Sequence, residues 1–113
     1  MSAITTHVLD TSRGRPAGGV PVTLEMEAAG GWILLGKGTT NADGRISDLL
    51  PADTPIEGGV YRLIFDTGRY FANNNVDAFY PQVTIIFKIE NPDQHYHVPL
   101  LLSPFGYSTY RGS

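Results

Sequence analysis

The sequence predicts an all-β protein, a β-sandwich of seven or eight short strands that forms a single domain over residues 1–113. Several short segments alternate apolar and polar residues, which is the pattern of strands with one buried face. Clusters of Gly, Pro, Asn and Asp separate these segments, and such clusters are typical of turns. A length of 113 residues also suits one domain with one hydrophobic core.

Three alternating segments occupy the first half of the chain, at residues 4–10, 20–27 and 32–38. The second of them alternates most clearly, because its apolar residues fall at every second position. The sequence Ala-Gly-Gly at 29–31 predicts a hairpin connection into the third segment. The sequence Asn-Ala-Asp-Gly at 41–44 predicts a tight turn, which brings Arg45 to the start of the next segment.

Four more segments with strand character follow, at residues 60–66, 83–89, 95–102 and 106–110. Residues 68–74 lack the alternation and predict a short helical turn. Ile86 interrupts the alternation of its segment, which predicts that both faces of that strand are covered.

Composition excludes several classes of function. The chain has no cysteine, so disulfides, thiolate catalysis and cysteine-based zinc sites are ruled out. A formal charge of −3 without a basic block gives no support for nucleic-acid binding. No apolar run approaches the roughly 20 residues of a membrane-spanning helix. We expect no membrane partner and a cytoplasmic location, or a periplasmic one if a signal peptide has been removed.

The histidines are the first candidates for chemistry. His95 and His97 are one residue apart on a predicted strand, so their side chains project from the same face. With His7 they could form a zinc site, although hydrogen-bonded surface histidines are the commoner arrangement and no carboxylate is evident to orient the rings. His7 is either an edge or interface histidine, or an imidazole that takes a proton from water.

Arg45 and the C-terminal segment are the other candidates. Arg45 follows a turn, where arginines are usually solvated, but its guanidinium could also hold a carbonyl or an oxyanion. Aromatic residues continue almost to the last position, which predicts a tail that docks on the body of the protein. The sequence then finishes with Tyr110, Arg111, Gly112 and Ser113, which are either functional groups or loose polar residues.

Six motifs over nearly the whole chain resemble the transthyretin-related proteins. They are Ile-Thr-Thr-His-Val-Leu-Asp at 4–10, Gly-Arg-Pro-Ala-Gly-Gly-Val-Pro-Val at 14–22, Thr-Asn-Ala-Asp-Gly-Arg at 40–45, Phe-Tyr-Pro-Gln-Val at 79–83, His-Tyr-His-Val-Pro-Leu-Leu-Leu-Ser-Pro at 95–104 and Tyr-Arg-Gly-Ser at 110–113. The last motif is similar to the signature that separates the 5-hydroxyisourate hydrolases of this family from the hormone-carrying transthyretins.

The resemblance implies a fold, an assembly and a reaction. The fold is the transthyretin-like sandwich of eight strands in two four-stranded sheets with one short helix. The assembly is a homotetramer, a dimer of dimers whose active sites lie at the dimer–dimer interface. The reaction is the hydrolysis of 5-hydroxyisourate to 2-oxo-4-hydroxy-4-carboxy-5-ureidoimidazoline in urate breakdown, without a metal or another cofactor.

The resemblance also implies roles for the matching residues. His7 or His97 would act as general base, Arg45 would hold the substrate and the developing negative charge, and Ser113 could orient a histidine through its carboxylate. The residues expected to bind substrate are His7, Arg45, Tyr110, Arg111, Gly112 and Ser113. His95 is expected to be peripheral. The alternatives are a small-ligand carrier on the same fold and, less favoured, a non-enzymatic sandwich module.

Overall fold

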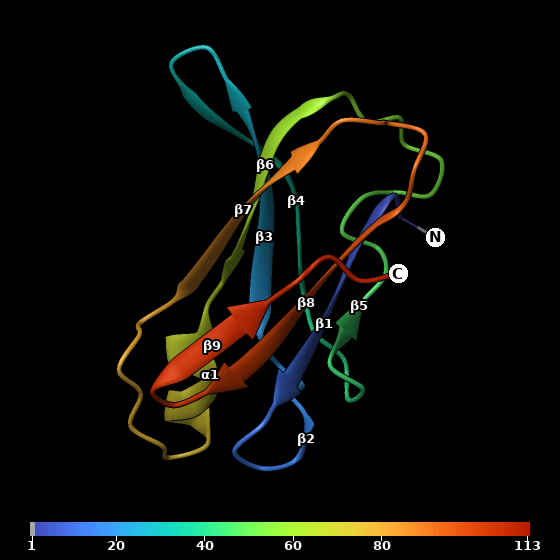
Figure 1. Cartoon of the computed structure of the whole chain (residues 1–113). Coiled ribbons are helices and arrows are strands. Elements are labelled where there is room, and N and C mark those ends of the chain that lie inside the picture. The colour runs from blue at the N-terminus through green and yellow to red at the C-terminus, as the bar shows by residue number, and fades with distance from the viewer. Residues whose placement is uncertain (1) are drawn as a thin grey trace.

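A computed structural model describes residues 2–113, which form two β-sheets packed face to face with a short helix at one end (Figure 1). The first sheet has the order β2-β1-β8-β9, with β5 also paired to β1, and the second has the order β4-β3-β6-β7. The strands of the first sheet are β1 (Ile4–Asp10), β2 (Arg15–Pro16), β5 (Arg45–Ile46), β8 (Tyr96–Ser103) and β9 (Gly106–Thr109). Those of the second are β3 (Pro21–Ala28), β4 (Gly31–Thr39), β6 (Gly59–Phe65) and β7 (Val83–Ile89).

The predicted sandwich is confirmed, and each predicted strand is present within a residue or two of its expected limits. Residues 2–113 contain nine strands where the resemblance implies eight. The difference arises because β2 and β5 are two-residue strands that pair with separate parts of β1 along the same edge. Together they take the place of one interrupted edge strand.

The predicted helical turn is also confirmed, as helix α1 (Thr67–Asn73). Asp66 is its N-cap, and the carboxylate accepts a hydrogen bond from the Arg69 amide at 3.2 Å. The helix docks on the sandwich through Tyr70, whose hydroxyl donates to the Asp10 carboxylate at the end of β1 at 2.7 Å. No helix in residues 2–113 is long and apolar enough to cross a membrane.

Large apolar side chains from both sheets fill the space between them. Those that are almost fully buried include Ile4, Val8, Val22, Leu24, Tyr61, Leu63, Phe65, Val83, Ile89, Leu100 and Leu102. The alternation in the sequence identified most of this core, because the inward face of each strand is apolar at every second residue. The described residues share one such core, as a single domain requires.

Ile86 differs from the prediction. Its side chain is 60 % exposed on the outer face of β7, so one face of that strand is uncovered in the single chain. Strand β7 is the edge of its sheet, and among residues 2–113 it pairs only with β6 (Figure 1). An apolar residue at this position therefore indicates a surface that the fold of one chain leaves open.

Strands β1 and β8 lie side by side and run parallel, in register from Ile4 opposite Tyr96 to Asp10 opposite Leu102. Successive residues of a strand point to opposite faces. The pairing therefore places Ile4, Val8 and Leu100 on the inner face and Thr5, His7 and His97 on the outer face.

Candidate active site

A tight turn ahead of β5 positions Arg45. The Asn41 side chain accepts hydrogen bonds from the backbone amides of Asp43 and Arg45, at 2.9 and 3.0 Å. Gly44 has a φ of +74°, which favours glycine, and a β-carbon there would also collide with the Val8 carbonyl. The Val8 amide in turn donates to the Gly44 carbonyl at 2.7 Å. The turn is thus fixed against β1.

The consequence is that Arg45 pairs with His7 across the β1–β5 ladder. Paired residues on neighbouring strands present their side chains on the same face of the sheet. The sequence placed these two residues 38 positions apart, and only the pairing of β5 with β1 brings them together.

The parallel pairing of β1 with β8 brings His97 to the same region. His97 lies directly opposite Thr5 in the ladder, and its Nδ1 atom is 2.8 Å from the Thr5 hydroxyl oxygen. The same hydroxyl is 3.1 Å from Nε2 of His95. A threonine therefore orients the His97 ring, where a carboxylate would have been the usual partner.

These residues border a pocket of about 260 Å³ on the outer face of the first sheet. It is small, at the lower end of the volumes that ligand pockets occupy. Its lining, among the described residues, consists of Thr5, Thr6, Arg45, Ile46, Ser47, His95, His97 and Ser113. The structure thus brings Arg45, His97 and Ser113 to one pocket, with His7 just outside it beside Arg45.

The surroundings keep both site imidazoles neutral at pH 7. Burial lowers the pKa of His97, and the nearby Arg45, His7 and His95 lower it further. Burial and the charge of Arg45 also lower the pKa of His7, whereas its hydrogen bond to the Asp43 backbone and the Asp43 carboxylate raise it. A neutral imidazole has a free lone pair, so each ring can accept a proton near neutral pH.

The end of the chain is held against β8, as the sequence predicted. The Gly112 amide donates to the His97 carbonyl at 2.8 Å, and these two residues form an isolated β-bridge. A β-carbon on Gly112 would lie 2.6 Å from Cδ2 of the His97 ring and 3.3 Å from Pro99. Only a glycine lets the backbone approach the imidazole this closely, and the approach places Ser113 in the pocket.

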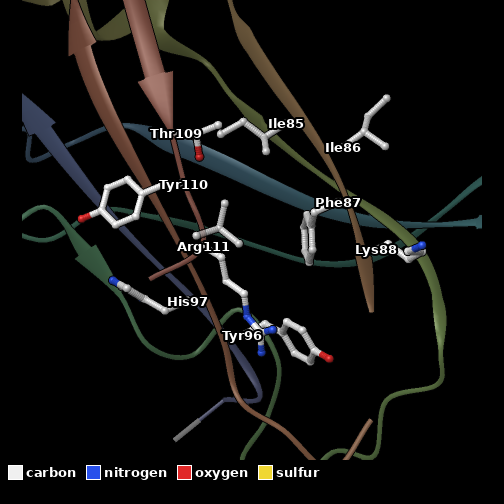
Figure 2. A pocket seen from close by; sticks show the side chains of 10 residues that line it. Ile85, Ile86, Phe87, Lys88, Tyr96, His97, Thr109, Tyr110 and Arg111 are labelled. Atoms are coloured by element: carbon white, nitrogen blue, oxygen red, sulfur yellow. The ribbon is translucent and has the colours of Figure 1, made fainter. Parts of the chain in front are cut away.

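Tyr110 and Arg111, which precede Gly112, line a different pocket. Figure 2 shows a second pocket, of about 240 Å³, that lies between β7 and the terminal segment and includes Tyr110 and Arg111 in its lining. The Arg111 guanidinium lies 4.5 Å from the centre of the Tyr96 ring and donates to the Gln94 side chain at 3.1 Å. Arg111 therefore anchors the tail, and His97 borders both pockets.

Five residues that line the pocket were missed in the sequence or assigned no part in it, and Thr5, Ser47 and His95 are the most informative of them. Thr5 binds both imidazoles, and Ser47 lines the pocket. His95, which we expected to be peripheral, lines the pocket as well. Thr5 could have been found, because it lies two residues from His7 and therefore on the same face of β1. Ser47 follows β5 directly and lies two residues from Arg45, so the same rule applies to it, although the pairing of that segment with β1 was not predicted.

The positions of the three histidines bear on the zinc site that the sequence left open. No group of three or more His, Asp or Glu side chains in residues 2–113 is arranged to hold a metal ion. His95 and His97 instead share the Thr5 hydroxyl. The observed contacts of the histidines are thus hydrogen bonds within the protein.

The fold and this site define a β-sandwich with an imidazole, a guanidinium and hydroxyl groups gathered at a small pocket on one sheet face. The chain belongs to the HIUase/Transthyretin family, whose sequence model matches residues 4–112. It is 50 % identical over 115 residues to the 5-hydroxyisourate hydrolase of Halalkalibacterium halodurans, with 97 % of each chain covered.

Solved structures agree with this assignment. The 5-hydroxyisourate hydrolase of Klebsiella pneumoniae matches with a TM-score of 0.85 and 39 % identity, covering 97 % of this chain and 98 % of that one. Sea bream transthyretin in complex with thyroxine matches with a TM-score of 0.89 and 34 % identity, covering 98 % and 95 %. Because a hydrolase and a carrier match almost equally well in shape, the fold does not separate their functions.

Proposed function

We propose that this chain hydrolyses 5-hydroxyisourate to 2-oxo-4-hydroxy-4-carboxy-5-ureidoimidazoline in urate breakdown. The observation that carries the proposal is the meeting of His97 and Arg45 at one pocket, with His7 paired to Arg45. These residues supply a base and an oxyanion-binding cation, which hydrolysis of a cyclic amide requires. Relatives that share about half of the sequence are 5-hydroxyisourate hydrolases.

The reaction needs water to add to a ring carbonyl. An imidazole takes one proton from the water while the new C–O bond forms, a contribution of roughly 10²–10⁴ in rate. The carbonyl oxygen becomes negative, and the two-donor fork of Arg45 is suited to hold it. The ring C–N bond then breaks, and the departing nitrogen receives a proton from the imidazolium. Every proton in this sequence is exchanged between water, substrate and protein, so no cofactor is needed.

The terminal residues complete the site in this proposal. Ser113 lines the pocket beside His97 and is placed to contact the substrate or a histidine. Tyr110 is 58 % exposed and lines the second pocket, which His97 also borders. We propose that it contacts substrate together with Gly112, whose backbone lies so close to the His97 ring that a β-carbon there would collide with it.

We also propose a homotetramer, a dimer of dimers with the sites at the dimer–dimer interface. Large apolar side chains left exposed by the single chain support it, among them Ile86, Phe79, Phe105 and Tyr107. Light scattering should give four times the mass of one 12.3 kDa chain. A monomer at micromolar concentration would contradict this assembly. The cytoplasmic location stays a prediction from the sequence.

The direct test of the activity generates 5-hydroxyisourate with urate oxidase and follows its decay by ultraviolet absorbance. We expect the protein to accelerate the decay strongly, both before and after exhaustive treatment with a chelator. A variant carrying Arg45→Ala and His97→Asn is the matched control for non-specific effects. Decay at the spontaneous rate would refute the proposed activity. Activity lost with the chelator and restored by zinc would refute the metal-free mechanism.

A small-ligand carrier is the second candidate, because sea bream transthyretin, solved with thyroxine, has nearly the same fold. The ionisable groups at the pocket oppose it, because Arg45, His95 and His97 gather there and a site that only carries an apolar ligand has no need of them. Equilibrium dialysis against thyroxine distinguishes the two. We expect no saturable binding at micromolar concentrations, and tight binding without hydrolase activity would favour the carrier.

A further inference from the structure

The hydroxyl of Thr5 lies between two imidazoles. It is 2.8 Å from Nδ1 of His97 and 3.1 Å from Nε2 of His95, and Thr5 is only 7 % exposed. A hydroxyl has a single hydrogen and two lone pairs, so it can donate to at most one of these nitrogens and must accept from at least one. The contacts therefore link the protonation pattern of one ring to that of the other.

Two kinds of arrangement satisfy both contacts when the rings are neutral. In the first, Thr5 accepts from Nδ1–H of His97 and either donates to Nε2 of His95 or accepts from that nitrogen as well, so Nε2 of His97 keeps its lone pair. In the second, Thr5 donates to Nδ1 of His97 and accepts from Nε2–H of His95, which places the hydrogen of His97 on Nε2. Only the first arrangement gives His97 a free nitrogen that can act as a base.

Arg45 favours the first arrangement. Its guanidinium lines the same pocket as His97 and has N–H donors but no acceptor. A ring nitrogen that faces this cation is favoured when it carries a lone pair and disfavoured when it carries a hydrogen. Since Nδ1 is occupied by Thr5, Nε2 is the nitrogen left for the pocket. Figure 2 shows the His97 ring pointing away from the Ile85 and Phe87 side of the second pocket.

We infer that Thr5 is a positioning residue that holds His97 in its Nδ1–H tautomer, so that Nε2 is the nitrogen that takes the proton from water. His95 has a part in this when its Nε2 accepts the hydroxyl hydrogen, because Thr5 then cannot donate to His97. When His97 becomes charged it keeps the same hydrogen bond to Thr5, so no group has to turn during the reaction. The inference rests on the proposed function and selects His97 over His7 as the base.

The charged and titratable surroundings of His97 come from several elements. They are His7 on β1, Arg45 on β5, His95 ahead of β8, Lys88 on β7, and Tyr110, Arg111 and the Ser113 carboxylate in the terminal segment. The Thr5 hydroxyl stabilises the charged form of His97, because it accepts a stronger hydrogen bond from charged than from neutral His97. Its removal should therefore lower the pKa of His97 further.

Nitrogen NMR of histidine-labelled protein tests the tautomer without measuring activity. In the wild type we expect Nδ1 of His97 to carry the hydrogen and Nε2 to be unprotonated at pH 8. Thr5→Val removes the hydroxyl and keeps a β-branched side chain of similar shape, so the two tautomers should then mix. Thr5→Ser keeps the hydroxyl and should preserve the wild-type pattern. A wild-type His97 with its hydrogen on Nε2 would overturn the inference, even if the valine variant did not fold.

Kinetics supply the second measurement. For Thr5→Val we expect kcat to fall roughly tenfold, as for the loss of one hydrogen bond to the reacting group, with KM almost unchanged. The acidic limb of its kcat/KM profile should also move to lower pH, and Thr5→Ser should restore both. If Thr5 only packed against its neighbours, Thr5→Val would lower the activity without moving the acidic limb of the kcat/KM profile. That result would overturn the inference.

The two proposals fail in different ways. A wild type that does not accelerate 5-hydroxyisourate decay refutes the proposed activity, while the NMR experiment still decides what Thr5 does to His97. A wild type that is active, with a valine variant equal to it in kcat and pH profile, refutes the role of Thr5 and leaves the activity standing.

Discussion

The two faces of strands β1 and β8 differ in what their residues contribute. On the inner face Ile4, Val8 and Leu100 are fully buried among the apolar residues of both sheets. On the outer face Thr5 and His97 line a small pocket that also contains Arg45 and His95, and His7 pairs with Arg45 beside it. The inner face of these two strands therefore stabilises the fold, and the outer face supplies the side chains of the candidate active site. Substitutions on one face should change stability, and substitutions on the other should change turnover.

The largest expected effect is the loss of an imidazole from the outer face. We expect His97→Asn to lower kcat by about 10²–10⁴, since a general base is removed. His7→Asn should also lower turnover strongly. Steady-state kinetics with thermal unfolding measure both quantities, and the melting temperature should stay close to that of the wild type. A large fall in melting temperature would show that the outer face also stabilises the fold.

Removal of the guanidinium should have the next largest effect. We expect Arg45→Ala to lower kcat/KM by roughly 10²–10³, the usual cost of losing one oxyanion donor. Arg45→Lys should also be poor, because a point charge does not reproduce the two-donor fork. Arg15→Ala, on the neighbouring two-residue strand β2, is the matched control and should retain activity. Equal losses at Arg15 and Arg45 would indicate a general charge effect.

Substitutions on the inner face should lower the stability of the fold and leave turnover unchanged. Leu100→Ala removes a fully buried side chain and should destabilise the fold by about 2–5 kcal/mol, measured by urea unfolding. The folded fraction should keep its turnover number. Leu101→Ala, the next residue along and on the outer face, should cost less. The distinction between the faces would fail if Leu100→Ala lowered kcat of the folded protein as much as His97→Asn does.

A smaller effect is expected at Gly112. In Gly112→Ala the new β-carbon would press on the His97 ring at 2.6 Å, so the ring or the tail must shift. A displacement of this kind should lower kcat by about 10- to 100-fold, with little change in stability. Gly106→Ala is the matched control, because the nearest atom to its β-carbon is 3.8 Å away. Wild-type activity in Gly112→Ala would show that the tail tolerates adjustment.

The pH dependence should be the mildest effect near neutrality. His7 and His97 have a pKa below the ordinary value, so they become charged only in more acidic solution. Activity should therefore rise with pH through a midpoint below about 6.5 and be constant above it. Stability should rise over the same window, because the unfolded chain binds protons that the folded imidazoles do not. A midpoint above 7 would contradict the described surroundings of the two rings.

The sequence by itself determined the strands, the short helix and most of the core. The order and register of the strands could not be predicted from the sequence, because they depend on contacts between distant segments that alternation cannot specify. Ile86 shows the same limit, since alternation reports an apolar residue without saying whether this chain or another covers it, and within the single chain it is exposed.

The candidate site was also predictable only in part from the sequence. The sequence identified His7, Arg45, His97 and Ser113 as residue types suited to the chemistry, and the family resemblance assigned their roles. Only the tertiary structure decided that β5 pairs Arg45 with His7, and that Thr5 lies between His95 and His97. It also decided that Arg111 lies against Tyr96 while Ser113 reaches the pocket. Alternation fixes the face on which a side chain lies, whereas its neighbours on that face depend on how distant strands pair.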